Sequence, residues 1–208
     1  MMIMKKKGIV LFLLGILLLG GCFANIPLTH YYTFQPASER KLDREPLTSK
    51  YPYVIGIEEF EADAPYQQDR IVFRTSAYEV NFYEYHRWLR PPTELLQEQT
   101  VELLTASMLF QHVHAYALES FADYSLTGRL VMFDQWYHED KTASVYVGIT
   151  YQLIDPEQQR IVWNDTITVT SHISSLEVVE TIKAFESALH DNILQAITEI
   201  DRIVGQDQ

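Results

Sequence analysis

The sequence predicts a single α/β domain in which one mixed, largely antiparallel sheet is covered by two main helices. Apolar and polar residues alternate through 143–153, which is typical of a half-buried strand. Apolar residues recur every three or four positions from 178 to 204, the period of an amphipathic helix. A second helical pattern follows Pro91 and Pro92, after a β-rich segment. An early strand, a crossover helix, a run of strands and a final helix together give a layered sheet.

The chain begins with an export signal. Three lysines at 5–7 precede an almost unbroken apolar run, and the sequence Leu-Gly-Gly-Cys at 19–22 follows directly. The apolar segment 8–21 is shorter than the roughly 20 residues that a membrane-spanning helix needs, so we expect it to be removed. The Leu-Gly-Gly-Cys run resembles a bacterial lipobox, which implies that Cys22 is acylated and holds the protein to a membrane. The alternative is an ordinary signal peptide with an incidental cysteine.

The chain is therefore divided into three parts. We expect a signal peptide at 1–21, a lipidated N-terminus with a short tether and first strand at 22–50, and an α/β domain at 51–208. Cys22 is the only cysteine, which excludes an internal disulfide framework and a cysteine metal cage. The first strand-like stretch comes soon after Cys22, so the domain should lie close to its membrane.

The charge of the chain narrows the choice of partners. It carries 16 Lys and Arg against 28 Asp and Glu, a net charge of -12, and removing the three lysines of the signal gives -15. Such an acidic domain is repelled by nucleic acid and by anionic headgroups, so we expect no nucleic-acid partner and membrane contact through the lipid alone. An acidic contact patch would meet a basic partner; the simpler alternative is a solvated surface.

The remaining elements follow from local patterns. The expected elements are strands at 31–34, 53–60, 71–74 and 78–82, a helix from 92 to 108, a strand at 111–116, an antiparallel meander of three strands between 124 and 169, and a final helix from 174 to 204. Pro91 and Pro92 pre-set the backbone for a helix start. Ser174 with Glu177 gives a capping box, and Gly205 gives a stop. We expect the final helix to cover the sheet, with a coiled-coil partner helix as the alternative.

Two clusters of polar residues have side chains of the types found in metal or catalytic sites. His112 and His114 lie two residues apart, which suits zinc when a third ligand is supplied, but no third ligand has matching spacing. The acidic run at 58–63 lacks the glycine and the alternating ligands of a calcium loop. We favour solvated side chains in both places and expect no metal and no cofactor besides the lipid on Cys22. The sequence also has no phosphate loop, nucleophile elbow or His-Glu-x-x-His helix, so we expect no enzyme.

The stretch 71–96 carries a family resemblance. Arg74, Ser76, Phe-Tyr-Glu-Tyr at 82–85, Trp88 and Pro-Pro-Thr-Glu-Leu-Leu at 91–96 resemble the ABC-type transport auxiliary lipoproteins, the PqiC-like lipoprotein partners of envelope lipid-transport systems built on MCE-domain proteins. The resemblance extends more weakly over 123–135 and 160–163, and so covers most of the mature chain. It implies a layered α/β body similar to an anticodon-binding domain.

The export signal and the resemblance together predict an auxiliary subunit of an MCE/ABC-type intermembrane lipid transport system. The expected partners are an MCE-domain protein with its ABC or integral membrane permease, and the expected cargo is phospholipid or another hydrophobic molecule. Phe23 replaces the Asp that commonly retains lipoproteins in the inner membrane, which favours the periplasmic side of the outer membrane. The alternatives are a lipid-binding carrier and a structural envelope lipoprotein without a transporter. The sequence leaves open whether copies of the chain form a homo-oligomer.

The candidate contact residues form an aromatic and basic corner of the same stretch. They are Arg74, Tyr83, Tyr85, Trp88, Arg90 and Pro91. Tyr, Trp and Arg dominate binding hot spots, so this corner could hold the docking surface or the mouth of a lipid path. The alternative is that Trp88 and the tyrosines pack the hairpin against the first helix.

Overall fold

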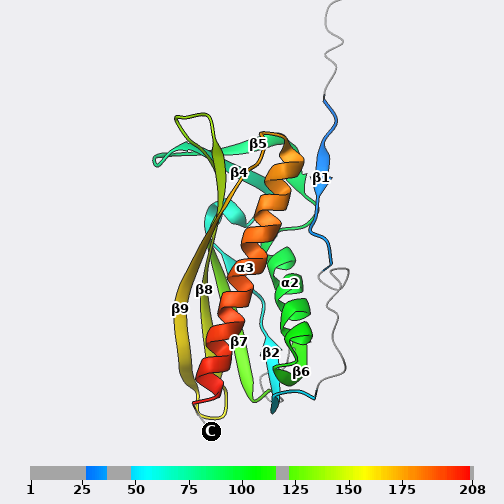
Figure 1. The fold of residues 1–208 in the computed structure, drawn as a ribbon, viewed down its shortest axis with the longest axis vertical. Helices are drawn as coiled ribbons and strands as arrows, with labels where there is room; N and C mark the ends of the chain where they lie inside the picture. The colour runs from blue at the N-terminus through cyan, green and yellow to red at the C-terminus, as the bar shows by residue number, and fades with distance from the viewer. Residues whose placement is uncertain (1–26, 37–47, 116–121, 207–208) are drawn as a thin grey trace, which may run out of the picture.

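The computed structural model describes residues 27–36, 48–115 and 122–206, so the predicted lipidation site Cys22 lies outside the described residues. The described residues form one nine-stranded sheet with two helices (Figure 1). The elements are β1 (His30–Tyr32), β2 (Tyr51–Ile57), β3 (Glu61–Ala62), the short 3-10 helix η2 (Ala64–Tyr66), β4 (Arg70–Ser76), β5 (Glu79–Trp88), α2 (Pro92–Ser107), β6 (Phe110–Ala115), β7 (Tyr124–Tyr137), β8 (Ala143–Asp155), β9 (Arg160–His172) and α3 (Val178–Val204). The prediction of an α/β domain with one mixed sheet and two helices is confirmed.

Strand β7 organises the sheet. Along one edge it pairs antiparallel with β8, and β8 pairs antiparallel with β9, which confirms the predicted meander. Along its other edge, β7 pairs in succession with β2, β3 and β4, and all three strands run parallel to it. The sheet then continues from β2 to β6 and from β4 through β5 to β1. The early strands therefore depend on a strand that comes later in the chain.

The prediction of a largely antiparallel sheet is wrong. Five of the eight strand pairings in the described parts of the chain are parallel, namely β1–β5, β2–β6, β2–β7, β3–β7 and β4–β7. Short turns join the antiparallel partners β4–β5, β7–β8 and β8–β9, so the sequence shows them as neighbours. Parallel partners need long connections, and local patterns do not reveal which strands those connections bring together.

The hairpin and first helix of the 71–96 stretch are confirmed with shifted bounds. We expected residues 75–77 to join two strands, but β4 continues to Ser76 and the turn is formed by Ala77 and Tyr78. Tyr78 is therefore 99% exposed at the tip, not on a half-buried strand face. The helix α2 starts at Pro92, as expected, and ends where Met108 adopts a left-handed conformation with φ of 55°.

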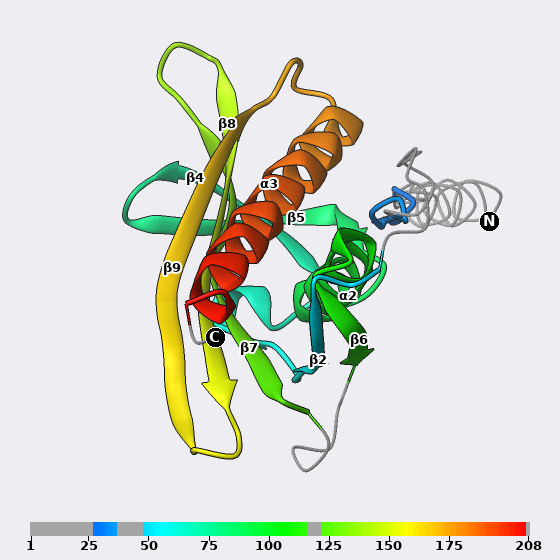
Figure 2. The same cartoon turned by 60° about the horizontal axis from the view of Figure 1, so that its bottom comes forward.

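Helix α3 covers the sheet, as predicted, and crosses the strands β8 and β9 (Figure 2). The predicted capping box is wrong, because the helix begins at Val178 and the Ser174 hydroxyl instead donates to Glu180 at 2.8 Å. The fully buried Asn192 fixes the helix on the sheet. Its amide nitrogen donates to the carbonyl oxygens of Val147 and Ile167 at 3.2 and 2.8 Å, and its oxygen accepts from Tyr151 at 2.9 Å.

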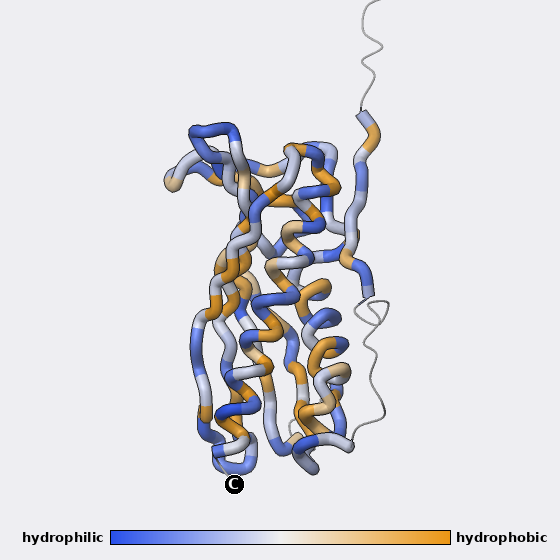
Figure 3. Tube along the Cα trace, viewed as in Figure 1, coloured by the Kyte–Doolittle hydropathy of each residue, from blue (hydrophilic) through white to orange (hydrophobic). Residues whose placement is uncertain are grey.

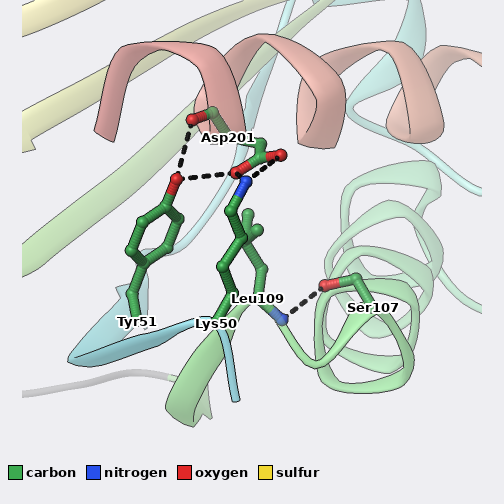
Figure 4. A network of polar contacts seen from close by, with 5 residues as sticks. All are labelled: Lys50, Tyr51, Ser107, Leu109 and Asp201. Carbon is green, nitrogen blue, oxygen red and sulfur yellow. Dashed lines mark hydrogen bonds and ion pairs between the residues drawn. The ribbon is translucent and has the colours of Figure 1, made fainter. Parts of the chain in front are cut away.

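A polar clamp joins the start of β2 to the last turns of α3 (Figure 4). The Lys50 ammonium donates to both carboxylate oxygens of Asp201 at 2.6 and 2.8 Å. The Tyr51 hydroxyl donates to Asp201 Oδ1 at 2.8 Å and to its backbone oxygen at 3.1 Å. Burial opposes ionisation of Asp201, but the hydrogen bonds from Lys50 and Tyr51 outweigh burial, so the pKa of Asp201 lies below its usual value. The clamp therefore holds the carboxylate in its charged form.

Replacing the clamp carboxylate should cost stability in a pH-dependent way. We expect Asp201→Asn to lower the free energy of unfolding by about 1 kcal/mol near neutral pH, because the three hydrogen bonds from Lys50 and Tyr51 lose a charged acceptor. A lowered folded-state pKa stabilises the fold above the unfolded pKa, about 3.9, and this stabilisation is lost as the pH falls through the folded pKa. Denaturant unfolding should show a larger wild-type advantage at pH 7 than at pH 3. Asp191→Asn, an exposed position on the same helix, is the control. An equal deficit at both pH values would contradict the charge-based account.

Candidate functional site

The six predicted contact residues do not form one corner. Trp88 is in the hydrophobic core, Arg74 is in a buried ion pair, and Tyr83 is in a cluster with polar residues of β7. Arg90 and Pro91 lie at the entrance to α2, and Tyr85 is half-buried on β5. The structure thus assigns these residues to five separate surroundings, and a contact role for them stays a prediction.

Trp88 joins three parts of the fold. Its side chain is 1% exposed, and its ring centroid lies 5.3 to 5.4 Å from those of Phe34, Phe133 and Phe185. These partners come from the segment after β1, from β7 and from α3. The packing matches the alternative interpretation of Trp88, with the difference that the indole packs against α3.

Arg74 neutralises a buried carboxylate. Its Nε donates to Asp134 Oδ2 at 2.5 Å, and the Tyr66 hydroxyl donates to Asp134 Oδ1 at 2.8 Å. Asp134 is 1% exposed and Arg74 is 17% exposed. Burial and the negative charge of Asp134 raise the pKa of Tyr66 to about 12. The guanidinium also lies 5.7 Å from the centroid of the Trp136 ring. Since Asp134 compensates the positive charge of Arg74 inside the fold, Arg74 attracts an external anion only weakly.

Tyr83 on β5 contacts side chains of β7 across the intervening strand β4. Its hydroxyl donates to Gln135 Oε1 at 2.8 Å and shares a 2.7 Å hydrogen bond with the Tyr137 hydroxyl. The Phe73 ring lies 5.0 Å away between centroids. Burial raises the pKa of Tyr83, so its hydroxyl stays protonated. These contacts match the alternative of a packing role for the tyrosines, but Tyr83 packs against β4 and β7 and not against the first helix.

Arg90 borders an open groove between α2 and the end of β6. The groove has a volume of about 290 Å³ and is lined by Arg90, Glu94, Gln97, Glu98, Val101, Glu102 and Ala115. The Arg90 guanidinium forms an ion pair with Glu98, and Pro91 is the N-cap of α2. Arg90 is the only base among these lining residues, so the groove is acidic.

Two features make this acidic groove a candidate docking surface. Glu94, Glu98 and Glu102 recur every four residues, which places them in one row along α2. Beside them, β6 pairs with β2 alone among the described strands, so its other edge has no strand partner within the described residues. An open strand edge next to a helix row can accept an extended or helical segment of a partner, and the acidic row favours a basic one. The glutamate spacing was visible in the sequence, but the open edge was not.

The two polar clusters are surface features. The rings of His112 and His114 stack 6.0 Å apart on β6, and no group of three metal-ligating side chains occurs within residues 27–36, 48–115 and 122–206. In the acidic run, Glu61 and Asp63 both pair with Arg129, at 3.2 and 2.7 Å. These ion pairs give two carboxylates of the acidic run a basic partner. None of the helices in the described residues is long and apolar enough to cross a membrane.

The fold and the open groove define a small layered domain suited to contact with another protein. The chain belongs to the family of ABC-type transport auxiliary lipoprotein components, whose model matches residues 32–196. It is therefore a lipoprotein component of ABC-type transport at the cell envelope, and this family role is not enzymatic. The resemblance found in the 71–96 stretch is confirmed at the level of the family.

Solved structures share the fold. Protein XCC0632 from Xanthomonas campestris is 22% identical with a TM-score of 0.70, and the match covers 78% of this chain and 92% of that one. An uncharacterized protein is 16% identical with a TM-score of 0.66, covering 84% and 99%. The hypothetical protein CT253 from Chlamydia trachomatis is 7% identical with a TM-score of 0.53, covering 74% and 98%. No curated protein sequence matches this chain.

Proposed function

We propose that this chain is the auxiliary lipoprotein of an MCE-type, PqiC-like lipid transport system, and that it docks on the MCE-domain partner. The family match over residues 32–196 carries the proposal. The export signal at 1–21 supports an anchor on Cys22, and Phe23 favours the periplasmic side of the outer membrane. The cargo is phospholipid or another hydrophobic molecule, which passes through the associated ABC or integral membrane permease. The described domain contributes a contact surface to that assembly.

The acidic groove is the proposed docking surface. Its row of glutamates would meet a basic segment of the MCE-domain partner, and the open edge of β6 would supply backbone hydrogen bonds. A carrier that holds lipid itself would need an enclosed apolar cavity, whereas this groove is open and lined mainly by charged side chains. The geometry therefore favours a docking subunit over a carrier.

An affinity pull-down tests the proposed function. The full-length lipoprotein is recovered from detergent-solubilised membranes beside a Cys22→Ala control. We expect an MCE-domain protein and its permease to be recovered with the wild-type chain, and less of both with Cys22→Ala, because the anchor holds the chain near its partners. Recovery of the lipoprotein alone, at outer-membrane density, would contradict the transport role and favour a structural envelope lipoprotein.

Reversing one charge in the groove tests the docking surface. We expect Glu98→Lys to reduce recovery of the MCE-domain partner about tenfold, because a basic segment would then face a like charge. Glu98 is exposed, and its ion pair with Arg90 contributes at most about 1 kcal/mol, so the domain should stay folded. Glu157→Lys makes the same charge change at the exposed turn between β8 and β9 and is the matched control. Equal recovery with both variants would place the docking surface elsewhere.

A further inference from the structure

Exposed apolar side chains gather at one end of the domain. The described residues contain ten exposed large apolar or aromatic side chains. Six of them belong to the segment around β1, the β4–β5 turn and the start of α3: Leu28, Tyr31, Tyr78, Val80, Leu176 and Val179. These three segments lie at the upper end of the molecule in Figure 1. We call this surface the tether end, and Figure 3 shows apolar positions there interspersed with polar ones.

Tyr78 is the most exposed of these side chains. It lies in the turn after Ser76, the last residue of β4, where the hairpin projects from the body of the domain (Figure 1). Its side chain is 99% exposed, so packing within the domain does not account for an aromatic ring at this tip. Tyrosine has an apolar body and a polar hydroxyl, and such residues are enriched where a bilayer meets water. Single exposed apolar residues are ordinary, but a projecting aromatic among five others at one end indicates a contact surface.

The chain enters the domain at the same end. Pro27, the first described residue, comes three residues before β1, and β1 lies at the upper end of the molecule in Figure 1. Pro27 lies five positions after Cys22, with four residues between them. An extended chain spans at most about 3.6 Å per position, so the reach is at most about 18 Å. A lipid on Cys22 would therefore hold the tether end against the bilayer, whereas the opposite end, with the β8–β9 turn, would point away.

We propose that the tether end is a second membrane contact, in which Tyr78 and the apolar residues at the start of α3 lie in the headgroup region of a phospholipid bilayer. This proposal rests on the proposed lipid anchor and revises the expectation that membrane contact comes from the lipid alone. The turn between β7 and β8 also lies at this end of the molecule (Figure 1), and charged groups there include Glu79, Glu139, Asp140, Lys141 and Glu177. Because acidic groups predominate, the surface suits zwitterionic headgroups and not anionic ones.

Depth-dependent quenching tests the contact. Full-length lipoprotein is reconstituted into phosphatidylcholine vesicles in which part of the lipid carries bromine near the headgroup. Tyr78→Trp places a fluorophore at the tether end, and Ile161→Trp places one at an exposed apolar position by the β8–β9 turn. Both variants share the background of Trp88, Trp136 and Trp163. We expect brominated lipid to remove most of the emission added by Tyr78→Trp and none of that added by Ile161→Trp.

The outcomes separate the contact from the anchor. Unquenched emission from Tyr78→Trp in protein that sediments with the vesicles would overturn the contact and leave the anchor intact. Equal quenching of both variants would also overturn it, because the domain would then lie on the membrane without a preferred end. If the wild-type chain fails to sediment with the vesicles, the anchor and the contact fail together. The tryptophan of Tyr78→Trp could also become buried only after an MCE-domain protein is added, as its emission spectrum would show. That result would assign the tether end to this partner and overturn the proposal.

Discussion

Trp88→Ala is expected to lower the free energy of unfolding by about 3–5 kcal/mol, the range for truncating a large buried aromatic residue. The indole fills the space between Phe34, Phe133 and Phe185, so its removal leaves a cavity where β5, β7 and α3 meet. Chemical denaturation followed by circular dichroism would measure the loss. Tyr78→Ala removes an aromatic ring that is 99% exposed and should change the unfolding free energy by less than about 0.5 kcal/mol.

The outcome also determines how the corner residues can be tested. If Trp88→Ala unfolds as the wild type does, the indole does not support the core, and a contact role becomes admissible. If the variant is destabilised as expected, replacing Trp88 and Arg90 together cannot distinguish lost docking from lost folding. Arg90→Ala alone then probes the groove, because Arg90 is paired with Glu98 at the surface.

Asp134→Ala is expected to lower the free energy of unfolding by about 3 kcal/mol or more, because it leaves the Arg74 guanidinium without its buried partner. The Tyr66 hydroxyl loses its acceptor at the same time. Thermal unfolding of the purified variant would measure the effect. Asp63→Ala breaks an ion pair with Arg129 in which both side chains are well exposed, so it should cost at most about 1 kcal/mol.

A double substitution separates the unpaired charge from lost packing. Arg74→Met combined with Asp134→Leu removes both charges and keeps most of the side-chain volume. We expect this variant to be more stable than Asp134→Ala, since an isolated buried charge costs more than an apolar replacement of the pair. A double variant as unstable as Asp134→Ala would show that the ion pair itself, and not the uncompensated charge, carries the stability.

Local sequence patterns predicted the positions of the helices and strands better than they predicted which strands pair. The proline pair fixed the start of α2, and the apolar period of α3 predicted both its length and its role as the cover of the sheet. The parallel pairings of β2, β3 and β4 with β7 could not be predicted, because each joins segments separated by some 60 residues with no shared local signal. The capping box failed because Ser174 lies four residues before α3 begins.

The packing of Trp88 against α3, and not only against the first helix, was not predicted because β5 is irregular. On a regular strand, residues six apart share a face, so Phe82 and Trp88 should point the same way. Instead, the pairing with β4 shifts between Val72–Phe82 and Arg70–Arg87. Extra residues on β5 turn Trp88 toward α3, while Phe82 packs under the Arg70 guanidinium at 4.4 Å. Alternation along the sequence cannot reveal such a shift.

The dependence of the early strands on β7 has a consequence for the order of folding. On export by the proposed signal at 1–21, strands β2, β3 and β4 would leave the translocation channel before β7 does. The strand edges that pair with β7 would then have no partner until residues 124–137 arrive. Such long-range pairing slows folding and leaves strand edges open to aggregation. Because Cys22 precedes all of these strands, the chain could be acylated before its domain closes. The newly exported protein would then need protection from self-association as an unfolded, acylated polypeptide.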